Sequence, residues 1–365
     1  MLTSINCGQQ KSTTQRNTPA NSDGVPANTN AANTSAALQP TPAAYDFTSL
    51  DNLLEQVARR HGGCALVVVK ADRVIYRKGF GTHLPDQVIP IASASKWLSG
   101  ALIMSLVDEG KLSLDDPVSK HLPEFTNDKA NITIRQLFSH TSGLPPEAGC
   151  RNDKRTSLAA CANQIARVKL RAAPGAEFHY GGVSQHVAGR IAEVITGKPF
   201  NQLFVERIAT PLGMARTDFF AYGPTDNPRP AGDARSSVDE YGRFLQMLLQ
   251  RGTFNGQRVL SQASVAEMHN DQTGGARIAY TIYERHARLD PKLLLARYGV
   301  GMWREKVDDR GQLLEASSQG ALGFSPWMDA ERNLAGVLSV RSSFSLALPD
   351  YLAIKDQIRR IVPPE

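Results

Sequence analysis

The sequence predicts a mixed α/β domain in which strands from both ends of the chain form one antiparallel sheet and helices are inserted between them. Two short apolar runs around a turn, residues 64–70 and 73–80, predict a strand hairpin near the N-terminus. Strand-like patterns return past Tyr298, at 299–304, 323–328 and 334–340. Because the intervening pattern is helical, the simplest compact arrangement joins the terminal strands in one sheet.

Apolar periodicity predicts the helices that would flank and interrupt this sheet. Residues 46–62 place Leu50, Leu53, Leu54 and Val57 on one face, and residues 92–109 form an amphipathic stretch that ends at Gly110. Further helices are predicted at 133–140, 157–168, 183–196, 200–208, 236–251 and 350–361. The prediction is therefore a sheet subdomain of about 45–90 and 295–365, and a helical subdomain of about 91–294.

Composition excludes several classes of protein. The 365 residues are 41% hydrophobic and 21% charged, with a net charge of +6, as in ordinary globular domains. Lys and Arg are scattered, so no nucleic-acid partner is expected. No C-x-x-C, HExxH, Walker A or G-x-G-x-x-G motif occurs, and no cofactor or metal is expected.

Residues 1–44 are polar and free of aromatic side chains, which is typical of a disordered tether before a domain at 45–365.

Three short motifs carry the candidate chemistry. Ser93-Ala94-Ser95-Lys96 is the single S-x-x-K, and on a helix Ser93 and Lys96 would share one face. A desolvated Lys96 can accept the proton of a nucleophilic Ser93, although a capping serine at an ordinary helix start would look the same.

The second motif, Tyr180-Gly181-Gly182, precedes a predicted helix. Tyr180 can accept or relay a proton if a nearby ammonium such as Lys96 lowers its pKa, and otherwise it is an ordinary loop tyrosine. The third motif is Ser318-Gln319-Gly320-Ala321, where the glycine allows close approach of a ligand. The Ala321 and Ser93 backbone N–H groups could together form an oxyanion hole, and a plain hairpin turn is the alternative.

Together these motifs resemble the serine β-lactamase and penicillin-binding superfamily, closest to the class C-like branch that includes family VIII carboxylesterases. The resemblance runs from about residue 50 to 361. It is supported by IRQLFSHTSGL at 134–144, PLGM at 211–214, AGDARSS at 231–237 and YGVGMW at 298–303. It implies a β-lactamase/D,D-peptidase-like fold, Ser93 as the acylated nucleophile, Lys96 and Tyr180 as the proton-transfer pair, and an oxyanion hole at Ala321.

Two departures from the family pattern bear on the substrate. Gly182 stands where the family's Tyr-x-Asn motif has the asparagine that helps to bind a lactam's acyl substituent. Ser318-Gln319-Gly320 stands in place of Lys-Thr-Gly or His-x-Gly, so the cation that would meet a substrate carboxylate is missing, unless Arg341 restores it. Both losses weaken a β-lactamase interpretation more than an esterase one.

We therefore expect a serine hydrolase that acts as a carboxylesterase on small esters. One alternative is a D,D-peptidase, D-aminopeptidase or weak β-lactamase, with a peptide, amide or lactam as substrate. A second alternative is a non-catalytic penicillin-binding-like protein, which would not need Ser93, Lys96 and Tyr180 all intact.

The cysteines suggest an oxidising compartment. Cys150 and Cys161 bracket a loop short enough to close as a disulfide, and free thiols in a cytoplasmic enzyme are the alternative. Cys7 precedes the polar tether, as the lipid-bearing cysteine of a bacterial lipoprotein would, although residues 1–6 contain no apolar signal core. An extracytoplasmic, periplasmic or lipid-anchored protein is expected, with membrane contact only through Cys7.

Overall fold

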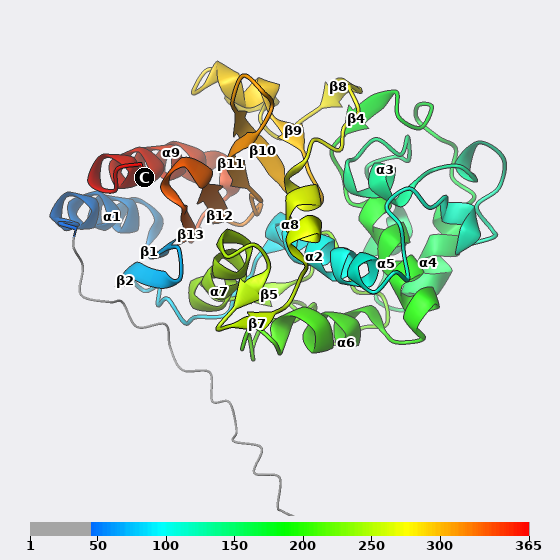
Figure 1. Cartoon of the computed structure of the whole chain (residues 1–365), viewed down its shortest axis with the longest axis horizontal. Helices are drawn as coiled ribbons and strands as arrows, with labels where there is room; N and C mark the ends of the chain where they lie inside the picture. The colour runs from blue at the N-terminus through cyan, green and yellow to red at the C-terminus, as the bar shows by residue number, and fades with distance from the viewer. Residues whose placement is uncertain (1–44, 365) are drawn as a thin grey trace, which may run out of the picture. The chain divides into compact units, whose positions relative to one another are not determined.

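A computed structural model describes residues 45–364 of the chain, and its central element is a seven-stranded antiparallel sheet (Figure 1). The strand order is β2-β1-β13-β12-β11-β10-β9. The strands are β1 (Gly63–Lys70), β2 (Arg73–Gly81), β9 (Arg297–Tyr298), β10 (Trp303–Val307), β11 (Leu313–Ser317), β12 (Phe324–Asp329) and β13 (Leu334–Val340). The N-terminal hairpin joins the C-terminal strands through the β1–β13 pair, which confirms the predicted fold.

Alternating side chains of β1 pack on opposite faces of the sheet. Leu66 and Val68 belong to a core shared with α1 (Thr48–His61) and α9 (Phe344–Ile361), which lie side by side (Figure 1). Val67 and Val69 belong to a second core, with α2 (Ser95–Asp108) and α7 (Val238–Leu249). Burial on both faces explains why β1 is a continuous apolar run instead of an alternating pattern.

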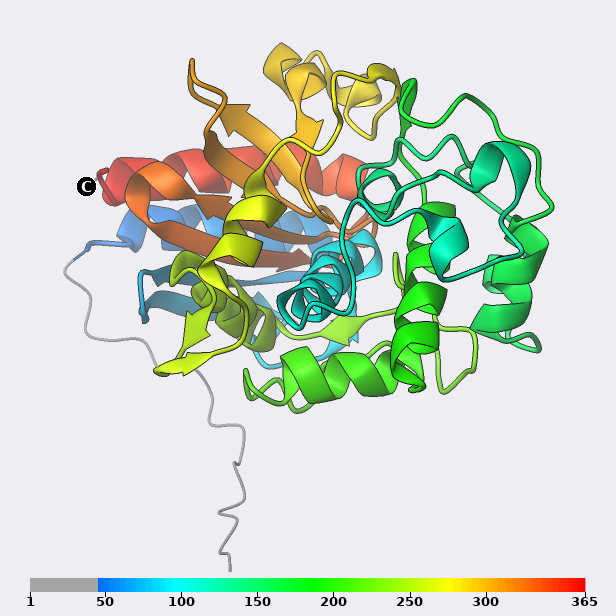
Figure 2. The same cartoon turned by 45° about the vertical axis from the view of Figure 1, so that its right-hand side comes forward.

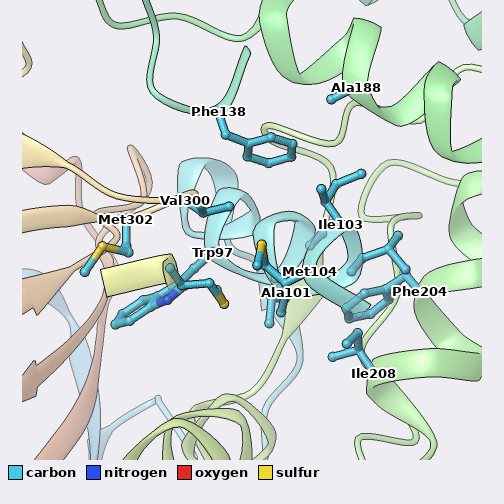
Figure 3. Packing of buried hydrophobic residues seen from close by; sticks show 14 of the residues in the cluster. Trp97, Ala101, Ile103, Met104, Phe138, Ala188, Phe204, Ile208, Val300 and Met302 are labelled. Atoms are coloured by element: carbon cyan, nitrogen blue, oxygen red, sulfur yellow. The ribbon is translucent and has the colours of Figure 1, made fainter. Parts of the chain in front are cut away.

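Helix α2 is the buried centre of the molecule. The sequence predicts an amphipathic helix here, but this prediction is wrong, because residues 95–106 are buried on every side of the helix. Figure 3 shows Trp97, Ile103 and Met104 of α2 among side chains from several other segments. These neighbours include Phe138, Ala188, Phe204, Ile208, Val300 and Met302.

The helical segment lies beside the sheet and packs around α2 (Figure 2). Its further α-helices are α3 (Ile134–Phe138), α4 (Leu158–Ile165), α5 (Val183–Thr196), α6 (Phe200–Phe204) and α8 (Gln262–His269), and a π-helix, Val205–Ala209, continues α6. Three small sheets pair β3 (Ile89–Pro90) with β5 (Arg235–Ser236), β4 (Glu177–His179) with β8 (Arg277–Tyr280), and β6 (Thr253–Phe254) with β7 (Gln257–Arg258). The 3-10 helices are η1 (Ala92–Ala94), η2 (Val118–Lys120), η3 (Asn127–Lys129), η4 (Gly149–Asn152), η6 (Glu284–His286), η7 (Pro291–Leu295) and η8 (Ala330–Arg332).

Two further predicted elements need correction. The strand predicted at 299–304 is wrong in its first half, because residues 299–302 form a tight turn between β9 and β10, closed by a 2.9 Å bond from the Gly299 N–H to the Met302 carbonyl. The last helix begins at Phe344, six residues before the predicted start, and includes Pro349. The predicted tether, residues 1–44, lies outside the described residues, and within 45–364 no helix is long and apolar enough to cross a bilayer.

A buried ionic network fastens α9 to the sheet. The Lys355 ammonium lies 2.8 Å from a Glu305 carboxylate oxygen on β10 and 3.0 Å from one of Glu315 on β11. Burial alone would lower the pKa of Lys355, but Glu305 and the neighbouring acidic groups raise it above its ordinary value. The free-energy cost of burying the charged Lys355 side chain is therefore offset only while both carboxylates are present.

Replacing Lys355 by methionine should destabilise the protein by about 3–5 kcal/mol, because Glu305 and Glu315 would be left buried without their ammonium partner. Urea denaturation measures the change in the free energy of unfolding. Lys306→Met is the matched control: that side chain is 53% exposed, and its loss should cost less than about 1 kcal/mol. Equal effects of the two substitutions would contradict the stabilising role of the network.

Candidate active site

Ser93 lies in a cavity of about 790 Å³ between α2, the Tyr180 loop and the end of β11, hereafter the Ser93 cavity. Two long segments complete its wall. Tyr222, Arg229 and Ala231 come from the connection before α7, and Tyr280 at the end of β8 is followed by residues 281, 282 and 284–286. Residues of two long connecting segments, 217–231 and 274–294, therefore line the site.

The Ser93 hydroxyl and the Lys96 amine lie within hydrogen-bond distance, with 3.1 Å between Oγ and Nζ. Nζ also lies 3.1 Å from the Ala231 carbonyl oxygen, and the Lys96 side chain is buried. Burial is the main cause that lowers the pKa of Lys96 to about 7; the nearby Arg151 charge acts in the same direction, and Glu147 opposes the shift. At neutral pH much of Lys96 is therefore an uncharged amine that can accept the Ser93 proton.

The backbone around the nucleophile is held by close packing. Ala92, which precedes Ser93, has a φ of 47°, a left-handed conformation that costs free energy in a non-glycine residue. Gly301, with a φ of 84°, brings the β9–β10 turn against the Lys96 carbonyl group, where any Cβ would collide. The contact with this turn therefore fixes the position of the first turn of α2, and with it the position of Lys96.

Tyr180 lies next to Ser93 and Lys96 and is surrounded by aromatic side chains. Its ring centroid is 4.7 Å from that of His140 and stacks at 5.2 Å on Trp303, and Lys96 Nζ lies 4.6 Å from it. Burial raises the pKa of Tyr180 above its ordinary value, although the hydrogen bond from Ser93 opposes this shift. The lowered pKa that the sequence argument required of Tyr180 is therefore wrong, because burial outweighs the Ser93 hydrogen bond. The neutral phenol can relay a proton, and Lys96 is the stronger candidate for the base.

The third motif divides into two parts. Gln319 and Ala321 line the Ser93 cavity, and the Ala321 N–H makes no hydrogen bond within residues 45–364, so it is free to pair with the Ser93 N–H around an oxyanion. Ser318 and Gly320 are not part of the cavity wall. The Ser318 hydroxyl instead donates to the Ser93 carbonyl oxygen at 3.3 Å and braces the strand against the nucleophile's turn.

Gln319 leaves hydrogen-bonding groups without partners at the cavity, whereas Gly182 leaves space for a neighbouring side chain. The Gln319 side chain is 3% exposed, and neither its amide nitrogen nor its oxygen has a partner within the described chain. Gly182 lines the cavity beside Arg151, and a Cβ there would lie 2.5 Å from the guanidinium carbon.

Arg341, which the sequence offered as a replacement cation, is exposed outside the cavity, and its charge acts on His83. The sequence argument missed Arg151, to which only the neighbouring Cys150 pointed.

Cys150 and Cys161 form a disulfide bond that joins η4 to α4, with 5.3 Å between their Cα atoms. Cys64 is a buried free thiol, and Cys7 lies outside the described residues. Within residues 45–364 no cluster of three or more His, Cys, Asp or Glu side chains could hold a metal ion.

The family model described as "Beta-lactamase" matches residues 50–357, most of the chain and all three motifs. The chain belongs to the beta-lactamase family. A crystal structure of a putative beta-lactamase from Bacteroides dorei is 33% identical, with a TM-score of 0.76, covering 87% of this chain and 99% of that one. The D-alanyl-D-alanine-carboxypeptidase/endopeptidase AmpH of Escherichia coli is 32% identical over 49% of each chain.

A family VIII carboxylesterase of known structure shares the fold, with a TM-score of 0.67 and 17% identity over 88% of this chain and 98% of that one. The chain matches between about a third and a half of the length of its curated relatives. Members of the family are serine hydrolases of several kinds: esterases, peptidases and beta-lactamases.

Replacing Lys96 by methionine should make the protein more stable at neutral pH, in contrast to Lys355→Met. Between pH 7 and 10.5 the unfolded chain binds the Lys96 proton and the folded chain does not, so this group lowers stability more as the pH falls. The stability advantage of the variant over the wild type should grow by about 2–3 kcal/mol from pH 9 to pH 7. Urea denaturation at both pH values measures it, and a pH-independent difference would contradict the buried, neutral amine.

Proposed function

We propose that this protein is a serine hydrolase that acts through an acyl-enzyme on Ser93, and that it is a carboxylesterase on small esters. The observation that carries the proposal is the buried Lys96 amine within hydrogen-bond distance of the Ser93 hydroxyl, with its pKa lowered to about 7. A nucleophile beside its own base at the floor of a cavity is the arrangement that acyl transfer requires.

In the proposed reaction, Lys96 removes the proton from Ser93 as Oγ attacks the ester carbonyl carbon. The Ser93 and Ala321 N–H groups would stabilise the negative charge that develops on the carbonyl oxygen. The proton then passes from Lys96, through the Tyr180 hydroxyl, to the departing alkoxide as the ester C–O bond breaks. Water repeats the sequence on the acyl-enzyme, releasing the acid and restoring Ser93.

The cavity wall supports an ester substrate over a lactam. Position 318, directly after β11, carries a serine where the family pattern has the cation that meets a lactam's carboxylate, and the neighbouring Gln319 of the cavity wall is uncharged. Arg341, which could have replaced that cation, lies outside the cavity. An ester needs only the nucleophile, the proton relay and the oxyanion hole. The shared fold with a family VIII carboxylesterase is compatible with this proposal.

Hydrolysis of peptides or amides is the second candidate. The 32% identity to AmpH favours it, as does the buried Gln319 amide, which can pair with a peptide group. A D,D-peptidase, a D-aminopeptidase or a weak β-lactamase would fit these two observations. A non-catalytic penicillin-binding-like protein fits less well, since such a protein gains nothing from burying an unpaired Lys96.

A substrate panel separates these candidates. The kcat/KM for p-nitrophenyl butyrate should exceed that for a chromogenic cephalosporin by at least about a hundredfold, a difference near 2.7 kcal/mol in transition-state stabilisation. Ser93→Ala should abolish turnover while leaving the protein folded. Lys96→Ala and Tyr180→Phe should each lower kcat severely and non-additively, because the two groups form one proton-transfer unit.

Efficient cephalosporin turnover would overturn the ester assignment while leaving the serine mechanism intact. Retention of more than about a tenth of the wild-type rate in Ser93→Ala would refute the nucleophile itself.

We also propose an extracytoplasmic location, periplasmic or lipid-anchored through Cys7, supported by the Cys150–Cys161 bond near the cavity wall. Intact-mass measurement after alkylation under denaturing conditions checks the bond in protein isolated from its source. Two further thiols should become alkylated only after reduction. Labelling of Cys150 and Cys161 without reductant would show that the bond is absent.

A further inference from the structure

We propose that Arg151 selects the substrate: its guanidinium binds a carboxylate carried by the ester, so that Ser93 acts preferentially on anionic esters. This inference rests on the proposed acyl transfer at Ser93 and names its substrate class. Its basis is the position of one buried, incompletely paired cation on the wall of the Ser93 cavity.

Arg151 is a charged side chain that is almost fully buried although one of its donors has no hydrogen-bond partner. It belongs to η4, lines the Ser93 cavity and is only 8% exposed. Its Nε–H is buried and has no hydrogen-bond partner within residues 45–364. A buried guanidinium whose donors are incompletely used is costly in free energy. Because Arg151 lines the Ser93 cavity, a carboxylate bound there could supply the guanidinium with a further acceptor.

Arg151 already has one carboxylate partner, but that ion pair contributes little free energy. In the described part of the chain, the single ionic partner of Arg151 is Glu147, whose side chain is 70% exposed. An ion pair with one end in solvent contributes little free energy, so Glu147 can turn into water when another carboxylate enters the cavity. The planar guanidinium then offers two parallel N–H donors, the geometry that fits a carboxylate.

The loop that carries Arg151 is firmly braced. The disulfide holds its neighbour Cys150 against α4. The Asn227 side-chain amide donates to the Cys150 carbonyl at 2.9 Å and to the Asp153 carbonyl at 3.0 Å, and its oxygen meets His186 of α5 at 2.8 Å. A binding group held this way loses little conformational entropy when the ligand arrives.

Gly182 provides the space for the guanidinium. Any side chain at this position, including the asparagine of the family pattern, would collide with Arg151 unless the arginine moved. Arg151 therefore occupies the flank of Tyr180 that Gly182 leaves open, near enough for its charge to act on Lys96. Two other arginines line the cavity: Arg229 is already held by Asp233 through a 2.6 Å bond, and Arg285 is exposed to solvent. Arg151, which is buried, is therefore the better anion site.

Three chromogenic esters and three variants test this. The esters are p-nitrophenyl butyrate, which is neutral; mono-p-nitrophenyl glutarate, with a carboxylate on the acyl part; and the butyrate ester of 4-hydroxy-3-nitrobenzoate, with a carboxylate on the leaving group. Wild type should prefer at least one anionic ester over the neutral ester by about tenfold or more in kcat/KM. The preferred anionic ester shows which half of the substrate meets Arg151.

Arg151→Gln should remove this preference, and Glu147→Gln should strengthen it by freeing the guanidinium. Arg155→Gln is the matched control, because that arginine lies on the same loop with a side chain that is 91% exposed, and it should leave the preference unchanged. If Arg151→Gln folds poorly, the opposite response of Glu147→Gln still decides. A wild-type enzyme that hydrolyses all three esters without preference would overturn the role of Arg151 and leave the proposed esterase intact.

A binding measurement separates failure of the proposed function from failure of this inference. Glutarate, with sodium chloride at matched ionic strength as reference, should raise the melting temperature of the Ser93→Ala protein, and this rise should disappear when Arg151→Gln is added. Stabilisation without any ester hydrolysis would keep the anion site and refute the esterase. No stabilisation by glutarate, or equal stabilisation with and without Arg151, would refute the anion site.

Discussion

The burial of one amine, Lys96, is the constraint on which the rest of this site depends. An ammonium group taken out of water without a carboxylate partner loses hydration that nothing replaces, so its pKa falls to about 7. The Ala231 carbonyl and the Ser93 hydroxyl satisfy the neutral amine with two ordinary hydrogen bonds. The same burial that weakens the fold therefore produces a base at neutral pH, placed beside the hydroxyl on which it acts.

The architecture supplies what this burial requires. Helix α2 is enclosed on all sides, and the turn at Gly301 presses on the Lys96 carbonyl so closely that no side chain fits between them. That turn is carried by β9 and β10, and the network of Glu305, Glu315 and Lys355 holds β10 and β11 to α9. Lys355 and Lys96 are both fully buried, but the first is paired and remains charged, whereas the second is unpaired and loses its proton.

Local sequence signals account for most of the fold and for the core of the site. The bounds of β13 and α5 agree with the sequence prediction, because each is a single apolar pattern that agrees with its tertiary surroundings. Strand β11 was not predicted, since its Glu315 is buried only because Lys355 and Arg359 of a distant helix neutralise it. Ser93, Lys96 and Tyr180 could be found by motif, but the opposite shifts of their pKa values depend on burial. Arg151 could not be found, because its position depends on a glycine 31 residues further along and on Asn227 beyond it.

The central claim is that a neutral Lys96 activates Ser93. The most direct test is the rate at which a fluorophosphonate modifies the protein between pH 5 and pH 9, with the modified residue identified by peptide mass mapping. The account predicts a single modified serine, Ser93, and a rate that rises about tenfold per pH unit at low pH and levels off above about pH 7, where Lys96 loses its proton. Modification of a different serine, or a rate at Ser93 that does not change across this range, would contradict it.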